Sequence, residues 1–453
     1  MHRAVAHISL LLAISLASGC GKKDSTVAKQ GDIITKNNTE PQTGEKVPLV
    51  ETERTKLAGV WQGTLTLEGD DMEPQSVPFT MKISKADSEP SVVFSGDTEV
   101  PITRVSVQDG EVSLQFVPYH TKIVAQVDSA QGAMEGAWSL PWVDGSLDFA
   151  FTAKRFAEGE RVAIPDDSPS LDKAAIAALP SVGGVWEVSF PQPDGADKLC
   201  AARFEQEGSS VKGTFVAPTG DYGHLTGEFQ DGKLRLFNFD GAFAYVVSAD
   251  AQADGTLVGA GQFNLFRQEF SARPSKEGAL DRELPQCAEL TEWSGKRTPL
   301  SLTFTGLDGK SVALADLGLE GKVVLLDLFG TWCPNCHQLI PLLTELHKKY
   351  HATGLEIIGV GFEFADGQEA VSAYRDKHAI PYRMLVGAAP QDAPNVMPEV
   401  PLTSYPTLVL IGRDGKVHNI QTGFRGTATG EFRKADAARF EARIKKLLAQ
   451  GSN

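Results

Sequence analysis

Residues 323–341, VVLLDLFGTWCPNCHQLIP, combine a strand, a sharp turn and the start of a helix in one short stretch. Its first four residues are continuous and aliphatic, which is typical of a strand covered on both faces. Beyond Trp332 the apolar residues recur at helical spacing, so Cys333 and Cys336 fall on the first turn of the predicted helix. The sequence therefore places two cysteines between a buried strand and a helix.

The positions of these two cysteines predict different roles. A helix N-terminus presents unpaired N–H groups and the positive end of the helix dipole, which favours a thiolate at Cys333. Cys336 lies nearly one turn further along the same face, where it is placed to attack a mixed disulfide and release the partner. We predict that Cys333 is the nucleophile and Cys336 the resolving thiol, with no cofactor beyond this redox-active disulfide.

Two other interpretations of the same stretch remain open. The pentapeptide Cys333 to His337 also fits the attachment pattern for c-type haem, in which both sulfurs bond to the porphyrin and the histidine ligates iron. A structural zinc site would need two further ligands at suitable spacing, and we predict no metal. The redox dithiol is favoured because the pair stands between a buried strand and a helix.

The last third of the chain carries a family resemblance. The segments 298–304, TPLSLTF, and 307–314, LDGKSVAL, followed by 321–341, resemble the TlpA/ResA branch of the thioredoxin-like proteins. The resemblance covers about 293–448. It implies an α/β thioredoxin-like domain in a membrane-attached, extracytoplasmic thiol-disulfide oxidoreductase. It also implies disulfide-containing exported proteins as substrates, apocytochrome c among them in some members, and a membrane-bound electron donor.

The resemblance also implies site residues away from the dithiol. Asp327 takes the place of a buried acid that would accept the proton of Cys336; a strand-end Asp satisfied by hydrogen bonds is the alternative. Pro406, at the entrance of a strand, matches the family's cis-proline, and Tyr405 before it would face substrate. Glu363 matches an acidic residue near the dithiol, or else is an exposed loop glutamate. Substrate contact is also assigned to the neighbours Trp332, Pro334 and Asn335.

The sequence departs from the family pattern beside the dithiol. Phe329 replaces the usual Trp, His337 stands where Arg or Lys is common, and residues 338–340 lack the usual acidic residue. These departures leave the direction of electron flow open.

The N-terminus predicts export and a lipid anchor. Residues 1–19 have a weakly basic start and a short apolar core, which is a secretory signal and too short to cross a bilayer. The run Ala17 to Cys20 resembles a lipoprotein cleavage box, so Cys20 is expected to be acylated; ordinary signal cleavage with a stray cysteine is the alternative. Anchoring is expected at the periplasmic face of the outer membrane or the outer face of the cytoplasmic membrane. The polar segment 20–56 predicts a flexible tether.

The middle of the chain predicts two related β-domains. Three short motifs recur at offsets of 125, 122 and 123 residues, and this near-constant spacing predicts an internal duplication. Alternating apolar runs separated by turn dipeptides predict an antiparallel meander, a barrel or a sandwich, in each copy. The recurring pairs are 57–61 with 182–186, 110–114 with 232–236, and 132–137 with 255–260.

The expected fold class is therefore multidomain, with two duplicated antiparallel β-domains followed by an α/β thioredoxin-like domain. The β-domains show no enzymatic constellation, and a binding or scaffold protein that uses them is the alternative function. Some of their residues could line a ligand pocket, but core or surface fill is the favoured interpretation: His120, His224, Phe237, Phe239, Phe243 and Tyr245. The expected boundaries are 57–156 and 181–275 for the β-domains, 157–180 and 276–294 for linkers, and 295–453 for the last domain.

Two cysteines remain outside these motifs. Leftover cysteines of an exported protein usually pair, so Cys200 and Cys287 are predicted to form a structural disulfide; a second redox pair that exchanges with Cys333 is the rival. The net charge of −15 argues against binding to nucleic acid or anionic lipid. Membrane attachment would then depend on acyl chains.

Overall fold

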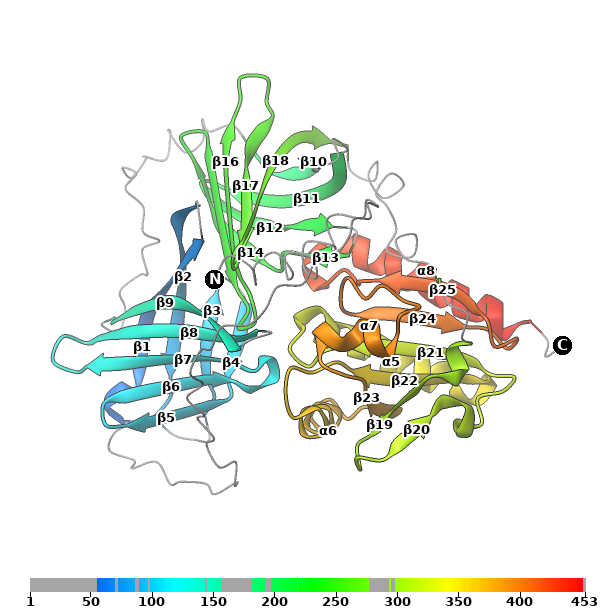
Figure 1. Cartoon of the computed structure of the whole chain (residues 1–453). Coiled ribbons are helices and arrows are strands. Elements are labelled where there is room, and N and C mark those ends of the chain that lie inside the picture. The colour runs from blue at the N-terminus through cyan, green and yellow to red at the C-terminus, as the bar shows by residue number, and fades with distance from the viewer. Residues whose placement is uncertain are drawn as a thin grey trace, which may run out of the picture.

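The computed structural model describes residues 55–69, 72–85, 89–96, 98–142, 145–156, 181–191, 197–217, 219–276, 293–294 and 298–450. Figure 1 shows three units side by side, two built of strands and one of mixed composition. We call them the first β-unit (residues 59–155), the second β-unit (184–275) and the thioredoxin-like unit (298–448). Cys20, Cys287, residues 20–54 of the expected tether, the linker 157–180 and residues 277–292 of the second linker lie outside the described residues.

The first β-unit is a single antiparallel sheet in the order β4-β3-β2-β1-β9-β8-β7-β6-β5. Buried and less buried residues alternate along β1, so one face of the sheet carries the core, as the period of two requires. A short 3-10 turn, η1 (Val117–Tyr119), joins β6 to β7. The strands are β1 (Gly59–Gly69), β2 (Met72–Ile83), β3 (Ser91–Ser95), β4 (Thr98–Ile102), β5 (Arg104–Gln108), β6 (Glu111–Phe116), β7 (Thr121–Asp128), β8 (Ala133–Trp142) and β9 (Gly145–Arg155).

The second β-unit is a closed antiparallel barrel. Its sheet runs β11-β10-β18-β17-β16-β15-β14-β12-β13, and an additional pairing of β11 with β12 closes the circle. Closure removes the unpaired sheet edges that would otherwise invite association. The strands are β10 (Gly184–Pro191), β11 (Asp197–Glu207), β12 (Ser210–Ala217), β13 (Gly220–Asp221), β14 (Leu225–Gln230), β15 (Lys233–Phe239), β16 (Ala244–Ala251), β17 (Leu257–Phe263) and β18 (Phe266–Ser275).

The two β-units share local geometry where their sequences recur. The indole N–H of Trp61 donates to the carbonyl of Leu57 at 2.9 Å, and that of Trp186 donates to the carbonyl of Val182 at 2.8 Å. Each hydrogen bond satisfies a buried indole N–H within the recurring motif, 57–61 or 182–186, at the start of its unit. Both units are thus barrel-like antiparallel sheets that begin in the same way.

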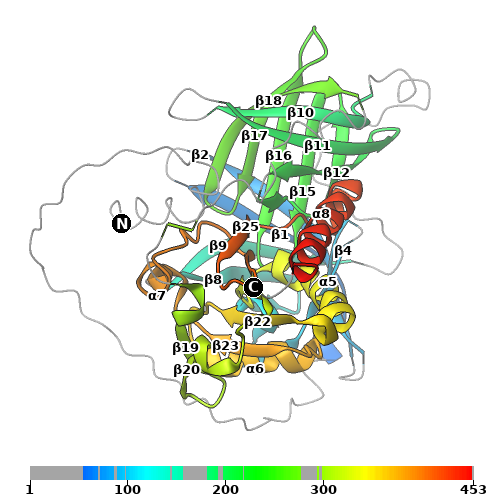
Figure 2. The same cartoon turned by 90° about the vertical axis from the view of Figure 1, so that its right-hand side faces the viewer.

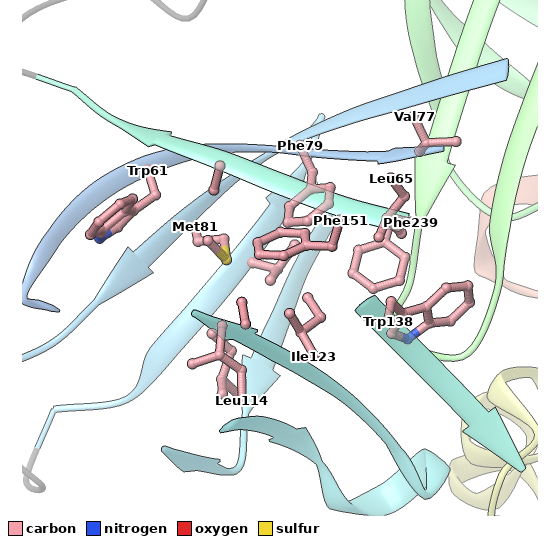
Figure 3. Close-up of a cluster of buried hydrophobic side chains, with 14 of the residues drawn as sticks. Trp61, Leu65, Val77, Phe79, Met81, Leu114, Ile123, Trp138, Phe151 and Phe239 are labelled. Carbon is pink, nitrogen blue, oxygen red and sulfur yellow. The ribbon is translucent and has the colours of Figure 1, made fainter. Parts of the chain in front are cut away.

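The second β-unit extends its β15–β16 hairpin into the core of the first. Figure 3 shows the Phe239 ring among the side chains of the first β-unit, near Phe79 and Trp138. The ring centroid of Phe239 lies 5.0 Å from that of Phe79 and 5.2 Å from that of Trp138. Burying one such ring contributes about 2 kcal/mol. The Phe239 amide also donates to Ser95 Oγ at 2.8 Å, so the two β-units share one core.

The thioredoxin-like unit is a mixed sheet in the order β20-β19-β23-β22-β21-β24-β25, in which β22 runs parallel to both β21 and β23. Its strands are β19 (Thr303–Gly306), β20 (Ser311–Ala313), β21 (Val323–Phe329), β22 (Leu355–Gly361), β23 (Arg383–Val386), β24 (Thr407–Ile411) and β25 (Val417–Thr422). Its helices are α5 (Pro334–Tyr350), α6 (Gly367–Lys377), α7 (Ala393–Val396) and α8 (Glu431–Leu448). The 3-10 turns are η3 (Pro299–Ser301), η4 (Leu314–Leu317), η5 (His351–Thr353), η6 (Pro390–Asp392) and η7 (Thr427–Thr429).

The central strand β21 is buried on both faces. Val323, Leu325 and Phe329 pack with the apolar residues of α5, α6 and α8, whereas Leu326 and Leu328 pack with the segment around α7 on the opposite face. Because side chains alternate along a strand, Asp327 projects toward the α5 side. No helix within the described ranges is both long and apolar enough to cross a membrane.

The thioredoxin-like unit also packs against the second β-unit, where α8 and β12 lie near each other in Figure 2. Phe432 of α8 joins a buried cluster with outward-facing residues of the barrel: Val185, Ala201 and Val216. The buried Arg425 donates through Nε to the carbonyl of Ala217 at 3.2 Å and pairs with Asp436 at 3.3 Å. The charge of Arg425 is thereby compensated at the interface.

Candidate active site

The two cysteines of the C-x-x-C stretch form a disulfide with Cα atoms 5.3 Å apart. Cys333 is the N-cap residue of α5, and its Sγ accepts the backbone N–H of Cys336 at 3.2 Å. Both residues are buried, with 5% and 3% of their surfaces exposed. The N–H group and helix dipole that meet Cys333 Sγ favour a thiolate there once the pair is reduced.

The Tyr405–Pro406 segment lies beside Cys333. The peptide bond between Tyr405 and Pro406 is cis. The Tyr405 carbonyl oxygen lies 3.5 Å from Cys333 Sγ, and the Tyr405 ring meets the Trp332 ring edge-on at 5.3 Å. The structure thus brings Trp332, Cys333 and Tyr405 together, and the half-buried Pro334 and Asn335 follow on the first turn of α5.

Asp327 lies in the middle of β21, between Gly359 of β22 and Leu408 of β24. Its side chain is 5% exposed, and its Oδ1 has no hydrogen-bond partner among the described residues. Burial alone raises the pKa of this carboxyl to about 7. The alternative of a strand-end Asp satisfied by hydrogen bonds is therefore wrong. A carboxyl with this pKa can both hold and release a proton near neutral pH.

Glu363 is 4% exposed, so the alternative of an exposed loop glutamate is also wrong. It accepts hydrogen bonds at 2.8 Å from both the backbone N–H and the Oγ1 hydroxyl of Thr331, two residues before Cys333. Burial raises the pKa of Glu363 to about 7, and the two hydrogen bonds from Thr331 oppose that rise.

A histidine of the first β-unit extends this network. His120 Nε2 lies 2.9 Å from Thr331 Oγ1 and 3.7 Å from Glu363 Oε2. Because the Thr331 hydroxyl donates to Glu363, it accepts from His120. A hydrogen-bond chain therefore leads from a β-unit to the buried carboxyl behind the dithiol. The sequence predicted only a pocket or fill role for His120, because no local pattern pairs it with a residue 211 positions away.

His337, on the first turn of α5, contacts residues of both its own unit and the first β-unit. Its Nε2 lies 2.7 Å from the Thr331 carbonyl and its Nδ1 lies 2.9 Å from His378 Nε2. The Tyr119 ring of η1 packs against it edge-on at 5.2 Å. Burial lowers the pKa of His337 to about 3, so this ring is neutral at physiological pH.

These contacts do not fit the haem interpretation. An axial iron ligand needs a ring nitrogen directed at the metal, and both nitrogens of His337 are engaged within the protein. For zinc, the described residues contain no group of three His, Cys, Asp or Glu placed to hold an ion. His347 and His351 stand at H-x-x-x-H spacing, but their rings stack with centroids 4.6 Å apart, and they belong to no such group of three within the described ranges.

The remaining sequence candidates fall in different places. Phe237 and Phe239 are core, as favoured. Tyr245 also belongs to the buried core of the second β-unit and Phe243 packs against that core, and both line a cavity at the dithiol as well. His224 lies 3.3 Å from Thr427 Oγ1 at the interface of two units. Cys200 is fully buried in the second β-unit; its proposed partner Cys287 is outside the described residues, and that disulfide stays a prediction.

Comparisons with known proteins match the C-terminal part of the chain. The AhpC/TSA family profile matches residues 295–420. A thiol-disulfide oxidoreductase ResA from Bacillus cereus is 33% identical over 161 residues, which are 36% of this chain and 79% of that protein. ResA from Bacillus thuringiensis is 32% identical over 123 residues, which are 27% of this chain and 66% of that protein.

Among solved structures, a thiol:disulfide interchange protein of the thioredoxin family from Chlorobium tepidum is 23% identical, with a TM-score of 0.26, and covers 34% of this chain and 99% of its own. The sequence match and the dithiol geometry define the class. The chain belongs to the ResA/TlpA-type thiol-disulfide oxidoreductases. The β-units precede the matched region.

Proposed function

We propose that this protein reduces disulfides of exported proteins through Cys333 and Cys336. The observation that carries the proposal is the placement of Cys333 Sγ, which accepts the N–H of Cys336 at 3.2 Å and lies 3.5 Å from the Tyr405 carbonyl. The first contact stabilises a thiolate, and the second marks where an extended substrate segment would lie.

In the proposed cycle, the Cys333 thiolate attacks one sulfur of a substrate disulfide and releases the other as a thiol. The Cys336 thiol then loses its proton, with Asp327 as the acceptor, and attacks the mixed disulfide. Two electrons and two protons pass to the substrate, and the chain is left with the Cys333–Cys336 disulfide. A dithiol donor at the membrane must then supply two electrons to restore it.

Two cysteine variants test this cycle. Cys333→Ser removes the nucleophile, and we expect insulin disulfide reduction with dithiothreitol as electron source to fall to the uncatalysed rate. Cys336→Ser keeps the nucleophile and removes the resolving thiol, so a covalent mixed disulfide with insulin should accumulate on a non-reducing gel. Normal insulin reduction by Cys333→Ser would refute the mechanism.

The direction of electron flow is tested by equilibrium with glutathione in a Cys200→Ser, Cys287→Ser background. Known dithiols of this type span roughly −120 to −270 mV. A value near the reducing end supports a reductase fed from the membrane. A value near the oxidising end would instead make the protein a disulfide donor or isomerase.

The location of the enzyme is part of the proposal. The signal-like segment 1–19 and the lipobox-like run before Cys20 support export and acylation, and the ResA relatives support work outside the cytoplasm. Acylated Cys20 would then attach the chain to a bilayer, with residues 20–56 as the tether. Metabolic labelling with a radioactive fatty acid, in wild type and in Cys20→Ala, tests the anchor.

We also propose that the β-units arose by duplication and serve in substrate binding. The recurrent motifs and the matching Trp61 and Trp186 hydrogen bonds support the first part. A role in substrate binding is supported by the cavity at Cys333, to which both β-units contribute residues. This role combines the alternative function of a binding protein with that of an oxidoreductase. Binding and thiol chemistry would then occur at the same site.

A further inference from the structure

A cavity of about 240 Å³ opens on the Cys333 side of the dithiol, and all three units line it. The first β-unit contributes Trp142 and the second contributes Tyr222, Phe243 and Tyr245. Trp332 and Tyr405 belong to the thioredoxin-like unit and flank Cys333 itself. A disulfide that reaches Cys333 through this cavity must therefore pass aromatic rings from the β-units.

The aromatic wall of the second β-unit is a continuous arrangement. The Tyr245 ring centroid lies 5.4 Å from that of Tyr222 and 6.1 Å from that of Phe243. Phe243 and Tyr222 are half-buried, and both line the cavity. Aromatic rings at these separations add favourable edge and stacking contacts to the burial of an apolar group.

The described lining of the cavity offers no cationic group to an anionic ligand. This described lining contains no Lys, Arg or His, and its only carboxyl groups are Asp221 and Asp240. Asp240 accepts the N–H groups of Ala242 and Phe243 at 2.9 and 2.7 Å, and Asp221 accepts that of Gly223 at 2.8 Å. These carboxyls hold backbone N–H groups of their own loops, and Asp221 also accepts that of Gly426 in the thioredoxin-like unit, so neither offers a partner to an acidic thiol such as glutathione.

Two buried polar atoms of the lining lack a hydrogen-bond partner within the described part of the chain. The buried Tyr405 hydroxyl and the buried Gln391 Oε1 have no hydrogen-bond partner among the described residues. Buried polar groups are normally paired, so two orphans at one cavity point to a ligand that supplies the partners. A peptide backbone provides both an N–H donor and a C=O acceptor.

From these observations we propose that the cavity binds the aromatic side chain that adjoins a cysteine in an extended polypeptide substrate. The ring enters between Trp332 and the wall formed by Phe243 and Tyr245, and the peptide groups on either side pair with Tyr405 and Gln391. Phe243 is thereby a specificity-determining residue supplied by the second β-unit. This inference rests on the proposed function, because it concerns which disulfides reach Cys333.

Short peptides with a methylthio-blocked cysteine test the inference on the full chain. The reduced protein reacts with peptide–S–S–CH₃ to give the Cys333–Cys336 disulfide, free peptide thiol and methanethiol, and mass spectrometry follows the peptide thiol. We expect acetyl-Phe-Cys to react on the order of tenfold faster than acetyl-Gly-Cys, the discrimination that an apolar pocket gives for a large group. Acetyl-Glu-Cys and oxidised glutathione should be slower than the Phe peptide.

Variants assign the preference to the cavity. Phe243→Ala should reduce the Phe-to-Gly rate ratio to about threefold or less, and Phe364→Ala, also at the cavity, is a second variant in case the first fails to fold. Val258→Ser, at a residue 48% exposed and away from the lining, is the control and should keep the wild-type ratio.

The outcomes separate the two proposals. Equal rates for all peptides with the wild-type protein, or an unchanged ratio in the cavity variants, would overturn the inference and leave the disulfide reductase intact. No reaction with any disulfide would overturn the proposed function as well.

Discussion

Asp327 is a carboxyl group in the centre of β21 whose Oδ1 has no hydrogen-bond partner within the described part of the chain. Its pKa of about 7 in the folded protein exceeds that of the unfolded chain, where the reference value is 3.8. Between these two values the folded state binds more protons, so the free energy of unfolding falls as pH rises through this window. Asp327 therefore costs stability at neutral and alkaline pH, which is consistent with a group retained for proton transfer.

Replacing this carboxyl by an amide removes the cost. Asp327→Asn should raise the free energy of unfolding by at most about 4 kcal/mol at pH 8.5, because one pKa unit corresponds to about 1.4 kcal/mol. The gain should shrink as pH falls toward 4. Denaturant unfolding of the oxidised protein at both pH values measures it, with Asp316→Asn at an exposed site as the control. A gain that is equal at both pH values would contradict this account of Asp327.

At the scale of elements, η1 reaches from the first β-unit to the back of the dithiol. Tyr119 packs on His337, and His120, just beyond η1, completes the chain through Thr331 to Glu363. Burial lowers the pKa of His120, so its ring is neutral at the pH of about 7 where Glu363 titrates, and it acts on the carboxylate through the hydrogen bond to Thr331 Oγ1 rather than through a charge. The β-unit thus influences the titration of a carboxyl near the active site.

Loss of His120 removes the hydrogen bond that polarises the Thr331 hydroxyl toward the carboxylate, so the pKa of Glu363 should rise above its value of about 7, by up to about half a unit. Carbon-13 NMR of labelled glutamate, with Glu363→Gln for assignment, measures the midpoint in wild type and in His120→Ala. His418→Ala, at a surface histidine paired with Asp414, is the matched control and should leave the midpoint in place. A midpoint that stays or falls in His120→Ala would disprove the coupling.

The elements themselves could be predicted from local sequence. The aliphatic run of β21 and the helical spacing after Cys336 require only neighbours along the chain, and so do the alternating strands of both β-units. His120 and Phe243 could not be placed in this way. Their partners are set by how the units pack, and an exposed-looking histidine or a strand aromatic has the same local pattern whether it meets solvent, core or another unit.

At the scale of the whole molecule, the units meet through close backbone contacts as well as side chains. Gly423, just after β25, has φ of +82°, and a Cβ there would lie 1.9 Å from the carbonyl oxygen of Thr219 in the second β-unit. Any other residue must push the two backbones apart. Glycine at this position therefore keeps the second β-unit, and with it the wall of Phe243 and Tyr245, closed against the dithiol.

Gly423→Ala should separate these units without touching the cysteines. We expect faster amide hydrogen exchange over residues 219–223 and a smaller preference for aromatic peptides, while insulin reduction continues because the dithiol is unchanged. Gly232→Ala is a matched control, since Gly232 also has a positive φ of +77° but no atom of the described residues lies within 4 Å of its added Cβ. If both variants raised the amide exchange rate at 219–223 equally, the strain of alanine at a positive φ, and not the contact of Gly423 with Thr219, would explain the faster exchange. The selectivity of the active site would then not depend on closure by the second β-unit.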